Sequence, residues 1–419
     1  MKDSGIEWIG EIPTDWELCK LKRLIKRVVG GIWGDEAQGD SNDVPCVRVI
    51  DFDRNNFKVK NVGFTVINLD KDRQRQYLLR QGDLLIEKSG GGEQQPVGFV
   101  VQYDLDMPAI YTNFIAKMEM NNYLTNSNFL KYIFATLYFQ GINTRSIKQT
   151  TGIQNIDIDS YMDEIIALPP LTEQQRIANY LDQKVAQVDY IIKKTKEYIE
   201  EYKKYKQSLI TEVVTKGLNP NIEMKDSGIE WIGEIPENWE MPKVKHLFYI
   251  GRGRVIAQTE LEEGGLYPVY SSQTKDDGCL GYINTYDFDK PQLTWTTDGA
   301  NAGTVFLRKG KYNCTNVCGT LLLKSNNNDL RYLKYALEYI AKYHKRPDTN
   351  GYKIMNNEMA EIKITLPPNK EQQQIADYLT KKCSEIDKII SQKEQIISEL
   401  ESYKKSLIYE YVTGKKRVI

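Results

Sequence analysis

The sequence predicts an α+β protein in which two mixed α/β domains alternate with two long helices that pair with each other as a coiled coil. Three observations carry this prediction. Two stretches have the apolar spacing of a coiled coil, and a tryptophan-bearing leader occurs twice. The segments between leader and helix contain short strand patterns separated by glycine-rich turns. Because leader, domain and helix follow in the same order in both halves, the chain is an internal repeat.

The first long helix is expected at Leu168–Gly217. Thr172 is expected to cap its first turn with Gln175 reaching back, and Gly217 is expected to end it. Its seam positions recur at alternating spacings of four and three residues, which is typical of a coiled coil. These positions are Leu181, Val185, Val188, Ile192, Thr195, Ile199, Tyr202, Lys206, Leu209 and Val213.

The second long helix, expected at Leu366–Lys415, repeats the first at an offset of 198 residues (366 minus 168). Its seam positions are Leu379, Cys383, Ile386, Ile390, Lys393, Ile397, Leu400, Lys404, Leu407 and Tyr411. The polar breaks repeat as well, since Lys404 matches Lys206 and Lys393 matches Thr195. Two unrelated surface helices, each packed on its own domain, are the alternative. The matching seams favour pairing of the two helices with each other.

The leader at Met1–Glu17 recurs as Met224–Glu240, with changes only at positions 14 and 15 of the first copy. Its tryptophan, isoleucine and proline residues predict a packing segment without chemistry. The predicted boundaries are 1–167 for the first domain with its leader, 168–217 for the first helix, 218–365 for the second domain with its leader, and 366–419 for the second helix and tail.

The two domains are expected to share one fold but to carry different surfaces. In the first, strands are expected at Cys46–Phe52, Val62–Ile67, Asp83–Glu87 and Val97–Val101, and a helix at Asn128–Phe139. In the second, strands are expected at Tyr267–Tyr270, Gly281–Asn284, Gln292–Thr296, Thr304–Leu307 and Gly319–Leu323, and a helix at Leu330–Tyr343. Thr112–Asn113 matches Thr315–Asn316, and a glycine opens the last stretch of each domain, at Gly152 and Gly351.

Composition excludes several classes of protein. The formal net charge is −1, so any nucleic-acid surface must be local. Cys314 and Cys318 have no second pair at zinc-finger spacing, and His246 and His344 are the only histidines. The six cysteines therefore indicate reduced thiols in a cytoplasmic protein rather than a metal site. No apolar run reaches membrane-spanning length, and the N-terminal stretch does not have the pattern of a signal peptide.

No motif predicts a catalytic centre. The glycines at 251 and 253 lack the third glycine of a dinucleotide loop, and Ser89–Gly92 lacks the lysine of a triphosphate loop. Glu87-Lys88 lacks the intervening residue of a nuclease-type carboxylate–lysine pair. The prolines at 169–170 and 367–368 lack the flanking residues of an amino-methyltransferase motif. Their position just before each long helix, where they keep the backbone extended, explains their presence.

Four polar loops are candidates for binding nucleic acid, at 87–95 and 143–150 in the first domain and at 295–303 and 345–353 in the second. They combine amides, hydroxyls and cations, which can pair with base edges and phosphates, with glycines that allow close approach. The candidate residues are Lys88, Ser89, Gly91, Gln94, Gln95, Arg145, Lys148, Gln149, Trp295, Thr297, Asn301, Arg346, Asn350 and Lys353. Ordinary solvated connections are the alternative for each loop. Function is favoured for the set, because the two halves differ most in these segments.

The repeated order of leader, variable segment and LPP-x-x-EQQ helix resembles the DNA specificity subunits of type I restriction–modification systems. The resemblance covers essentially the whole chain. It rests on the leaders, on the helix ends at Tyr205–Ile210 and Tyr403–Ile408, and on the two helix starts. Those starts are Leu168-Pro169-Pro170 with Glu173-Gln174-Gln175, and Leu366-Pro367-Pro368 with Glu371-Gln372-Gln373.

The resemblance implies that the domains are target recognition domains and that the helices are spacers pairing antiparallel, which gives pseudo-two-fold symmetry within one chain. It implies a subunit without enzymatic activity that binds a bipartite, asymmetric site on double-stranded DNA. Two modification (methyltransferase) subunits, which use S-adenosylmethionine, and restriction subunits, which use ATP and Mg²⁺ for translocation and cleavage, would bind to it. No cofactor is expected on this chain itself.

The residues expected to bind modification subunits are Glu173, Gln174, Gln175, Glu371, Gln372 and Gln373, on an outer face of the helices. A solvated face is the alternative. Two other functions remain open from the residues alone. A coiled-coil scaffold would retain no specific DNA, and a single-chain nuclease or methyltransferase would be active when purified alone.

Overall fold

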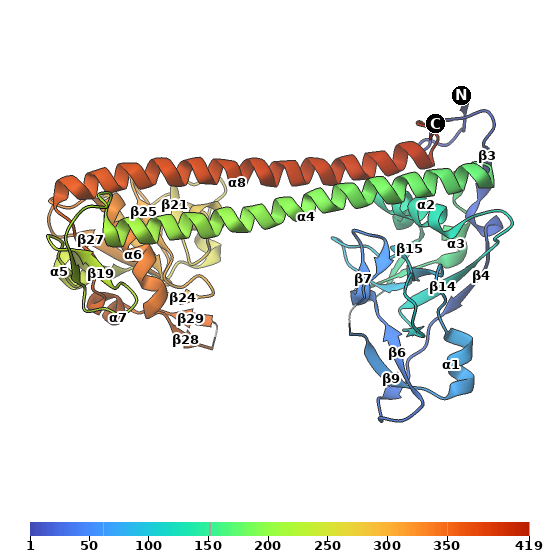
Figure 1. Ribbon diagram of the computed structural model, residues 1–419, viewed down its shortest axis with the longest axis horizontal. Helices are drawn as coiled ribbons and strands as arrows, with labels where there is room; N and C mark the ends of the chain where they lie inside the picture. Colours follow the sequence, from blue (N-terminus) through green and yellow to red (C-terminus); the bar gives the residue numbers. More distant parts are fainter. Residues whose placement is uncertain (62, 151, 350, 419) are drawn as a thin grey trace. The chain divides into compact units, whose positions relative to one another are not determined.

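The computed structural model describes residues 1–61, 63–150, 152–349 and 351–418. These residues form two compact units (Figure 1). Unit 1 contains Met1–Glu197 and Lys393–Ile419, and unit 2 contains Tyr198–Gln392. Each unit holds one globular domain, one leader and a part of both long helices. The repeat seen in the sequence is therefore also a repeat of structure.

The long helices are α4, Leu171–Lys216, and α8, Asn369–Val412. Both begin three residues later than predicted. The reason in unit 1 is that Ile165–Leu168 forms strand β17, which pairs antiparallel with β3, Glu17–Lys20. In unit 2 an isolated bridge between Glu240 and Leu366 occupies the equivalent place. Each leader end thus pairs with the chain immediately before its helix.

The predicted cap at Thr172 is wrong, because Thr172 lies inside the first turn of α4. The carbonyl of Pro170 accepts the first helical N–H groups, from Glu173 at 2.8 Å and Gln174 at 2.9 Å. Gln175 does not reach back, and its amide donates to Asn179 Oδ1 at 2.8 Å. The stop at Gly217 is confirmed, since α4 ends at Lys216 and Gly217 has a φ of 75°.

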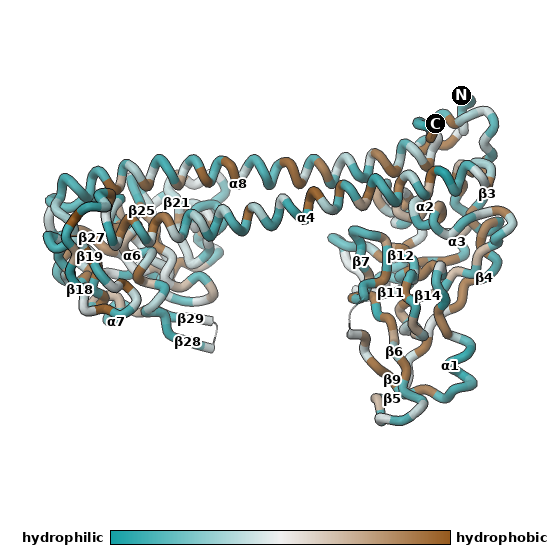
Figure 2. The backbone as a smooth tube through the Cα atoms, in the orientation of Figure 1, coloured by the Kyte–Doolittle hydropathy of each residue, from teal (hydrophilic) through white to brown (hydrophobic). Residues whose placement is uncertain are grey.

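The predicted seam residues are buried or half-buried in both helices. In unit 1 the first half of α4 packs on the end of α8, and one core contains Leu181, Val185 and Leu407. In unit 2 the end of α4 packs on the first half of α8, and one core contains Leu209 and Leu379. Within each unit the helices therefore run antiparallel, as the resemblance implied. Figure 2 shows the hydrophobic residues recurring along both helices among hydrophilic ones.

The two lysine breaks in the seams have aspartate partners on the facing helix. In unit 1 Lys404 Nζ lies 2.6 Å from Asp189 Oδ1, and in unit 2 Lys206 Nζ lies 2.7 Å from Asp387 Oδ2. Both partners repeat at the same offset of 198 residues (404 minus 206 and 387 minus 189). A polar pair at one seam position fixes the register of a coiled coil, because a shifted register would bury unpaired charges.

The two domains share a four-stranded antiparallel sheet, which confirms the prediction of a common fold. Its order is β4-β14-β10-β12 in unit 1 and β20-β27-β23-β25 in unit 2. The unit 1 strands are Ile25–Gly30, Ile115–Met120, Leu84–Glu87 and Val100–Gln102. The unit 2 strands are Phe248–Arg252, Cys318–Leu323, Gln292–Thr296 and Val305–Arg308. Helices α2, Ser127–Phe139, and α6, Leu330–His344, pack on these sheets.

Further strands extend each domain. In unit 1 the shared sheet continues through β8, Lys58–Val59, to β7, Phe52–Asp53, and a second sheet has the order β13-β6-β9-β5. The strands of this second sheet are Ile110–Tyr111, Asp43–Val47, Thr65–Asn68 and Asp35–Glu36. Unit 2 has a smaller sheet of order β22-β21-β26, formed by Cys279–Ile283, Tyr267–Tyr270 and Asn313–Cys314.

Three expected strands of the first domain differ from the structure. The strand at Cys46 ends at Val47, because Val49–Asp51 forms a 3-10 turn closed by Asp51 accepting from the Arg48 N–H at 2.8 Å. The strand expected from Val97 begins at Val100, after Gly98 with a φ of 98°. The strand expected from Val62 begins at Thr65, and Val62 lies outside the described residues.

Near the matching Thr-Asn dipeptides, the backbone of a glycine lies very close to the backbone of the turn in both domains. A Cβ at Gly31 would lie 2.2 Å from the carbonyl oxygen of Thr112, and one at Gly253 would lie 2.2 Å from that of Cys314. Only glycine allows the first sheet strand to meet this turn in either domain. The leaders pack partly as predicted, since Trp16 and Trp239 are fully buried whereas Trp231 is exposed.

Candidate nucleic-acid interface

The four predicted binding loops contribute strands to two small three-stranded sheets, one in each domain. In unit 1 the sheet has the order β11-β16-β15, from Ser89–Gly90, Ile153–Ile156 and Ile147–Thr150. In unit 2 it has the order β24-β29-β28, from Asp298–Gly299, Gly351–Lys353 and Arg346–Asp348. In unit 2 the predicted loop at 345–353 contains both strands of a hairpin. In unit 1 the predicted loop at 143–150 contains only β15, and its partner strand β16 lies beyond the predicted bounds. The earlier loop adds the third strand in both domains. The sequence predicted the loops, but it did not predict that the two loops of each domain pair in one sheet.

The two small sheets are joined to their domains in the same way. The Ile156 N–H donates to the Lys88 carbonyl, and the Ile354 N–H donates to the Thr297 carbonyl, each at 2.9 Å. Both isoleucine side chains are buried and anchor the hairpins. Lys88 and Thr297 are therefore equivalent positions. The glycines matched by sequence are not, since Gly152 lies between the strands of its hairpin and Gly351 opens β29.

In unit 1 the exposed face of the sheet carries a hydroxyl, an amide and a cation. Ser89 Oγ donates to Asn155 Oδ1 at 2.5 Å, and Asn155 is the Cα partner of Lys148. The exposed Lys148 ammonium lies 2.6 Å from Asp157 Oδ2. This hydrogen bond raises the pKa of Lys148 and lowers that of Asp157. Arg145 and Gln149 are exposed beside it.

The loop after β10 lines a groove of about 940 Å³ in unit 1. Its predicted candidates Gly91, Gln94 and Gln95 are exposed there. Beneath them, the buried Glu87 carboxylate lies 2.5 Å from Arg54 Nη2. Burial raises the pKa of Glu87, although Arg54 acts in the opposite direction. The ion pair between Glu87 and Arg54 fixes the part of the groove that lies against this loop.

In unit 2 the equivalent face is charged. Arg346 Nε donates to Glu358 Oε1 at 2.7 Å. Lys353 Nζ lies 3.0 Å from Asp298 Oδ1 and 3.1 Å from Asp348 Oδ2, and these hydrogen bonds raise its pKa. Asn301 is exposed on the adjoining turn. Asn350 lies outside the described residues.

Two predicted contact residues of unit 2 are wrong. Trp295 is fully buried, and its indole N–H donates to the carbonyl of Ile354 at 3.1 Å. Thr297 is also fully buried, and its hydroxyl donates to Asp298 Oδ2 at 2.5 Å. Both side chains support the small sheet from behind and cannot touch a ligand on its exposed face. The sequence pattern did not distinguish the two faces of this short segment.

The outer position predicted for Glu173, Gln174 and Gln372 is wrong, because all three are buried. Gln174 accepts from Thr125 Oγ1 at 3.1 Å and donates to the carbonyl of Leu124 at 3.0 Å. Gln372 occupies the equivalent place in unit 2, accepting from the Asp329 N–H at 2.9 Å. These side chains connect each helix to its own domain.

The carboxylates at these helix starts bind the leader tryptophans. The Trp16 indole N–H donates to Glu173 at 3.2 Å, and that of Trp239 donates to the half-buried Glu371 at 3.1 Å. Arg417 Nη2 also lies 2.8 Å from Glu173. The repeated tryptophan and the repeated glutamate are therefore one structural pair in each unit.

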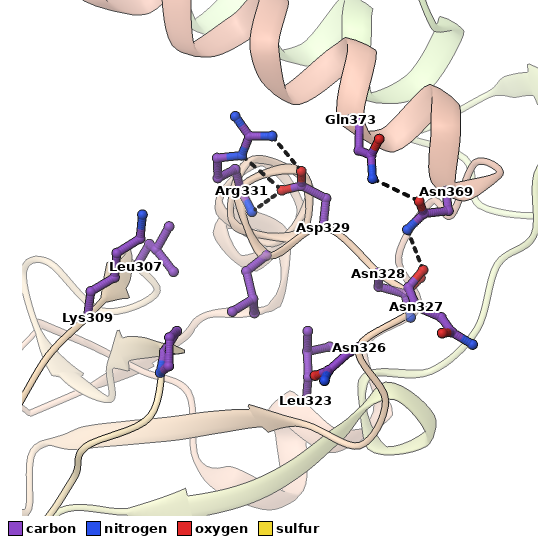
Figure 3. Close-up of a pocket in the computed structure, with 12 residues that line it drawn as sticks. Leu307, Lys309, Leu323, Asn326, Asn327, Asn328, Asp329, Arg331, Asn369 and Gln373 are labelled. Atoms are coloured by element: carbon purple, nitrogen blue, oxygen red, sulfur yellow. Dashed lines mark hydrogen bonds and ion pairs between the residues drawn. The ribbon is translucent and has the colours of Figure 1, made fainter.

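Gln175 and Gln373 remain as exposed candidates for partner binding. In unit 2 Gln373 lines a pocket of about 710 Å³ together with asparagines 326–328 and Asn369 (Figure 3). Its amide donates to Asn369 Oδ1 at 3.0 Å. The pocket offers amide donors and acceptors at the start of α8, beside the Arg331–Asp329 ion pair.

The sequence did not predict Asn155, Asp298 or the acidic partners Asp157 and Glu358. A signal was available for Asn155, since a glycine between two short segments that each begin with isoleucine is typical of a hairpin turn. Among the residues that the structure describes, no group of three or more His, Cys, Asp or Glu side chains could hold a metal ion. In the same part of the chain, no helix is long and apolar enough to cross a membrane.

These features define a chain with two unlike polar sheets on two copies of one fold, and comparison with known proteins identifies the class. Residues 13–201 and 236–402 match the family model described as type I restriction modification DNA specificity domain. The chain belongs to this family. Its relatives are specificity subunits rather than catalytic subunits, which agrees with the prediction from the sequence.

Among the curated relatives, the putative type I specificity subunit S.MpnORF285P of Mycoplasma pneumoniae is 33% identical over 183 residues. That match covers 42% of this chain and 60% of that protein. The putative type I restriction enzyme MjaX specificity subunit of Methanocaldococcus jannaschii is 26% identical over 434 residues, covering 98% of this chain and 96% of that protein.

Two solved structures show the same fold. A chain from a study of complex assembly and conformational transition of the type I R-M system has a TM-score of 0.73 and covers 97% of this chain and 100% of its own length. The HsdS subunit from Thermoanaerobacter tengcongensis has a TM-score of 0.55 and covers 99% of this chain and 100% of its own. Both are 15% identical to this chain.

Proposed function

We propose that this chain recognises a bipartite, asymmetric site on double-stranded DNA, with one half-site for each domain. The observation that carries the proposal is the pair of equivalent three-stranded sheets with different exposed residues. Because the two domains share one fold, each presents its small sheet in an equivalent position. The different side chains on the two sheets then select different base sequences. The domains in question are residues 1–167 and 218–365, and the connecting helices are 168–217 and 366–419.

The proposal extends to the partners. Two modification subunits carrying S-adenosylmethionine bind the chain, and restriction subunits carrying ATP and Mg²⁺ join them in the cytoplasm. Duplication of the helix starts supports two copies of one partner, since Gln175 and Gln373 are exposed at matching places. The chain itself binds none of these cofactors. With a net charge of −1, the isolated chain binds DNA weakly and with strong dependence on salt.

The test is a map of methylated adenines in DNA from cells that express this chain with its modification subunit. We expect one motif with two different half-sites separated by a fixed number of unspecified base pairs. Cells expressing the modification subunit alone are the control. Methylation that is unchanged by the chain, or a motif without a gap, would contradict the proposal.

A further inference from the structure

In each domain a row of three side chains crosses the small sheet from edge to edge. We name it the cross-strand row. In unit 1 it consists of Ser89, Asn155 and Lys148, because Asn155 is the Cα partner of both Ser89 and Lys148. Side chains of directly opposed residues lie on the same face of a sheet. All three therefore point to the exposed side, and the buried Gln154 points to the other.

The row in unit 2 consists of Asp298, Lys353 and Arg346. Lys353 is the Cα partner of both Asp298 and Arg346. The two rows match position by position, since β11, β16 and β15 correspond to β24, β29 and β28. A serine corresponds to an aspartate, an asparagine to a lysine, and a lysine to an arginine. The domains thus differ in chemistry at the first two positions and keep a cation at the third.

We propose that the cross-strand row is the base-recognition element of each domain, and that its central residue selects the base: Asn155 selects an adenine and Lys353 a guanine. The inference rests on the proposed function and names the residues that carry it. An asparagine amide offers a donor and an acceptor side by side, which matches the adenine edge in the major groove. A lysine offers only donors, which match the two acceptors of guanine.

The first residue of each row holds the central one in place. Ser89 Oγ donates to Asn155 Oδ1 at 2.5 Å, and the amide nitrogen of Asn155 keeps its donors. Lys353 Nζ lies 3.0 Å from Asp298 Oδ1 and 3.1 Å from Asp348 Oδ2, and the buried Thr297 hydroxyl fixes the other oxygen of Asp298 at 2.5 Å. A side chain held in one direction before binding loses less conformational freedom on binding.

The third residue has a different task. The side chains of Lys148 and Arg346 are 74% and 50% exposed, and each is paired with a carboxylate of the segment that follows its hairpin, Asp157 or Glu358. Exposed ion pairs of this kind contribute little stability, so the cation can exchange its carboxylate for a DNA phosphate at low cost. A cation is present at this position in both domains. Lys148 and Arg346 are therefore positioning residues for the DNA backbone.

The experiment uses the full chain assembled with its modification subunits and a library of duplexes with randomised sequence. Asn155→Ala is expected to reduce the preference for one base at a single position of the first domain's half-site, lowering the affinity ratio between the preferred base and the others by roughly tenfold. The selected sequence of the other half-site should stay unchanged. Lys353→Asn is expected to change which base is selected at one position of the second domain's half-site. Lys148→Ala is the matched control. It should lower the affinity for all duplex sequences about equally, and it should reduce the slope of log affinity against log salt concentration by about one.

Two results would overturn the inference. Selected sequences that are identical for the wild type, Asn155→Ala and Lys353→Asn would show that the row does not select bases. A uniform loss of affinity in Asn155→Ala, like that of Lys148→Ala, would make Asn155 a backbone contact. Failure of the wild-type complex to select any sequence would instead contradict the proposed function. Circular dichroism melting of each variant complex identifies a variant that has lost its fold, and Asn155→Ser and Lys353→Gln then replace it.

Discussion

At the scale of single residues, the structure separates side chains that the sequence places together. The Glu-Gln-Gln motif looks like one polar surface patch, yet Gln174 is buried and Gln175 is exposed. No local pattern could reveal this, because Gln174 hydrogen-bonds to the segment at 124–126, far away along the chain. The motif itself and its repetition were predictable. Its division into one structural amide and one exposed amide depends on tertiary packing.

Gln174→Ala is therefore expected to lower the free energy of unfolding by about 1–3 kcal/mol, because it leaves buried polar groups without partners. Gln175→Ala is the matched control on the next residue. It removes only exposed hydrogen bonds, with Asn126 and Asn179, and should change stability by less than about 0.5 kcal/mol. Urea titration of the purified chain measures both. Equal effects of the two substitutions would contradict the assignment of Gln174 to the domain–helix contact.

At the scale of elements, the long helices and most sheet strands follow from the sequence, and the small sheets do not. Heptad spacing over many turns is a strong local signal, so both helices were predicted to within three residues at their starts. By contrast, Ser89 pairs with Asn155 across a long stretch of chain. A pairing of this kind leaves no trace in either segment alone, and the loops were therefore predicted as separate features.

The two lysine–aspartate pairs of the helices are expected to differ in strength. The side chains of Lys404 and Asp189 are 6% and 18% exposed, whereas those of Lys206 and Asp387 are 30% and 55% exposed. Lys404→Met leaves Asp189 charged and largely buried, so we expect a loss on the order of 3 kcal/mol. Lys206→Met should cost less than about 1 kcal/mol.

Urea unfolding of the two single variants gives both values. The double variant Lys404→Met/Asp189→Leu, which removes the charge along with its partner, should recover most of the stability lost in Lys404→Met. Equal losses for Lys404→Met and Lys206→Met, or no recovery in the double variant, would show that the Lys404 pair does not behave as a buried one.

At the scale of the whole molecule, duplication is the property that the sequence revealed most directly. One leader, one fold and one helix occur twice, and the family membership agrees with a chain built to recognise two half-sites. The identity of the bases could not follow from the sequence. In the function proposed here, it depends on which side chains face outward on the small sheets. The sequence prediction placed Trp295 and Thr297 among them, and both are buried.

If the helices set the distance between the half-sites, lengthening both should lengthen the gap. One heptad inserted into each helix at facing positions preserves the seam and adds about 10 Å, which corresponds to roughly three base pairs. We expect the methylated motif to keep both half-sites and to gain that number of unspecified base pairs. An insertion into one helix alone is the control and should disrupt the seam. A gap of unchanged length in the doubly extended chain would contradict the role of the helices as a spacer.

The most direct test of separate recognition by the two domains replaces residues 241–365 with a copy of residues 18–167. The flanking leaders and helix starts are nearly the same in both halves, so the copy meets equivalent neighbours. When this chain is expressed with its modification subunit, we expect a methylated site made of two inverted copies of the first half-site. Retention of the original second half-site would contradict it.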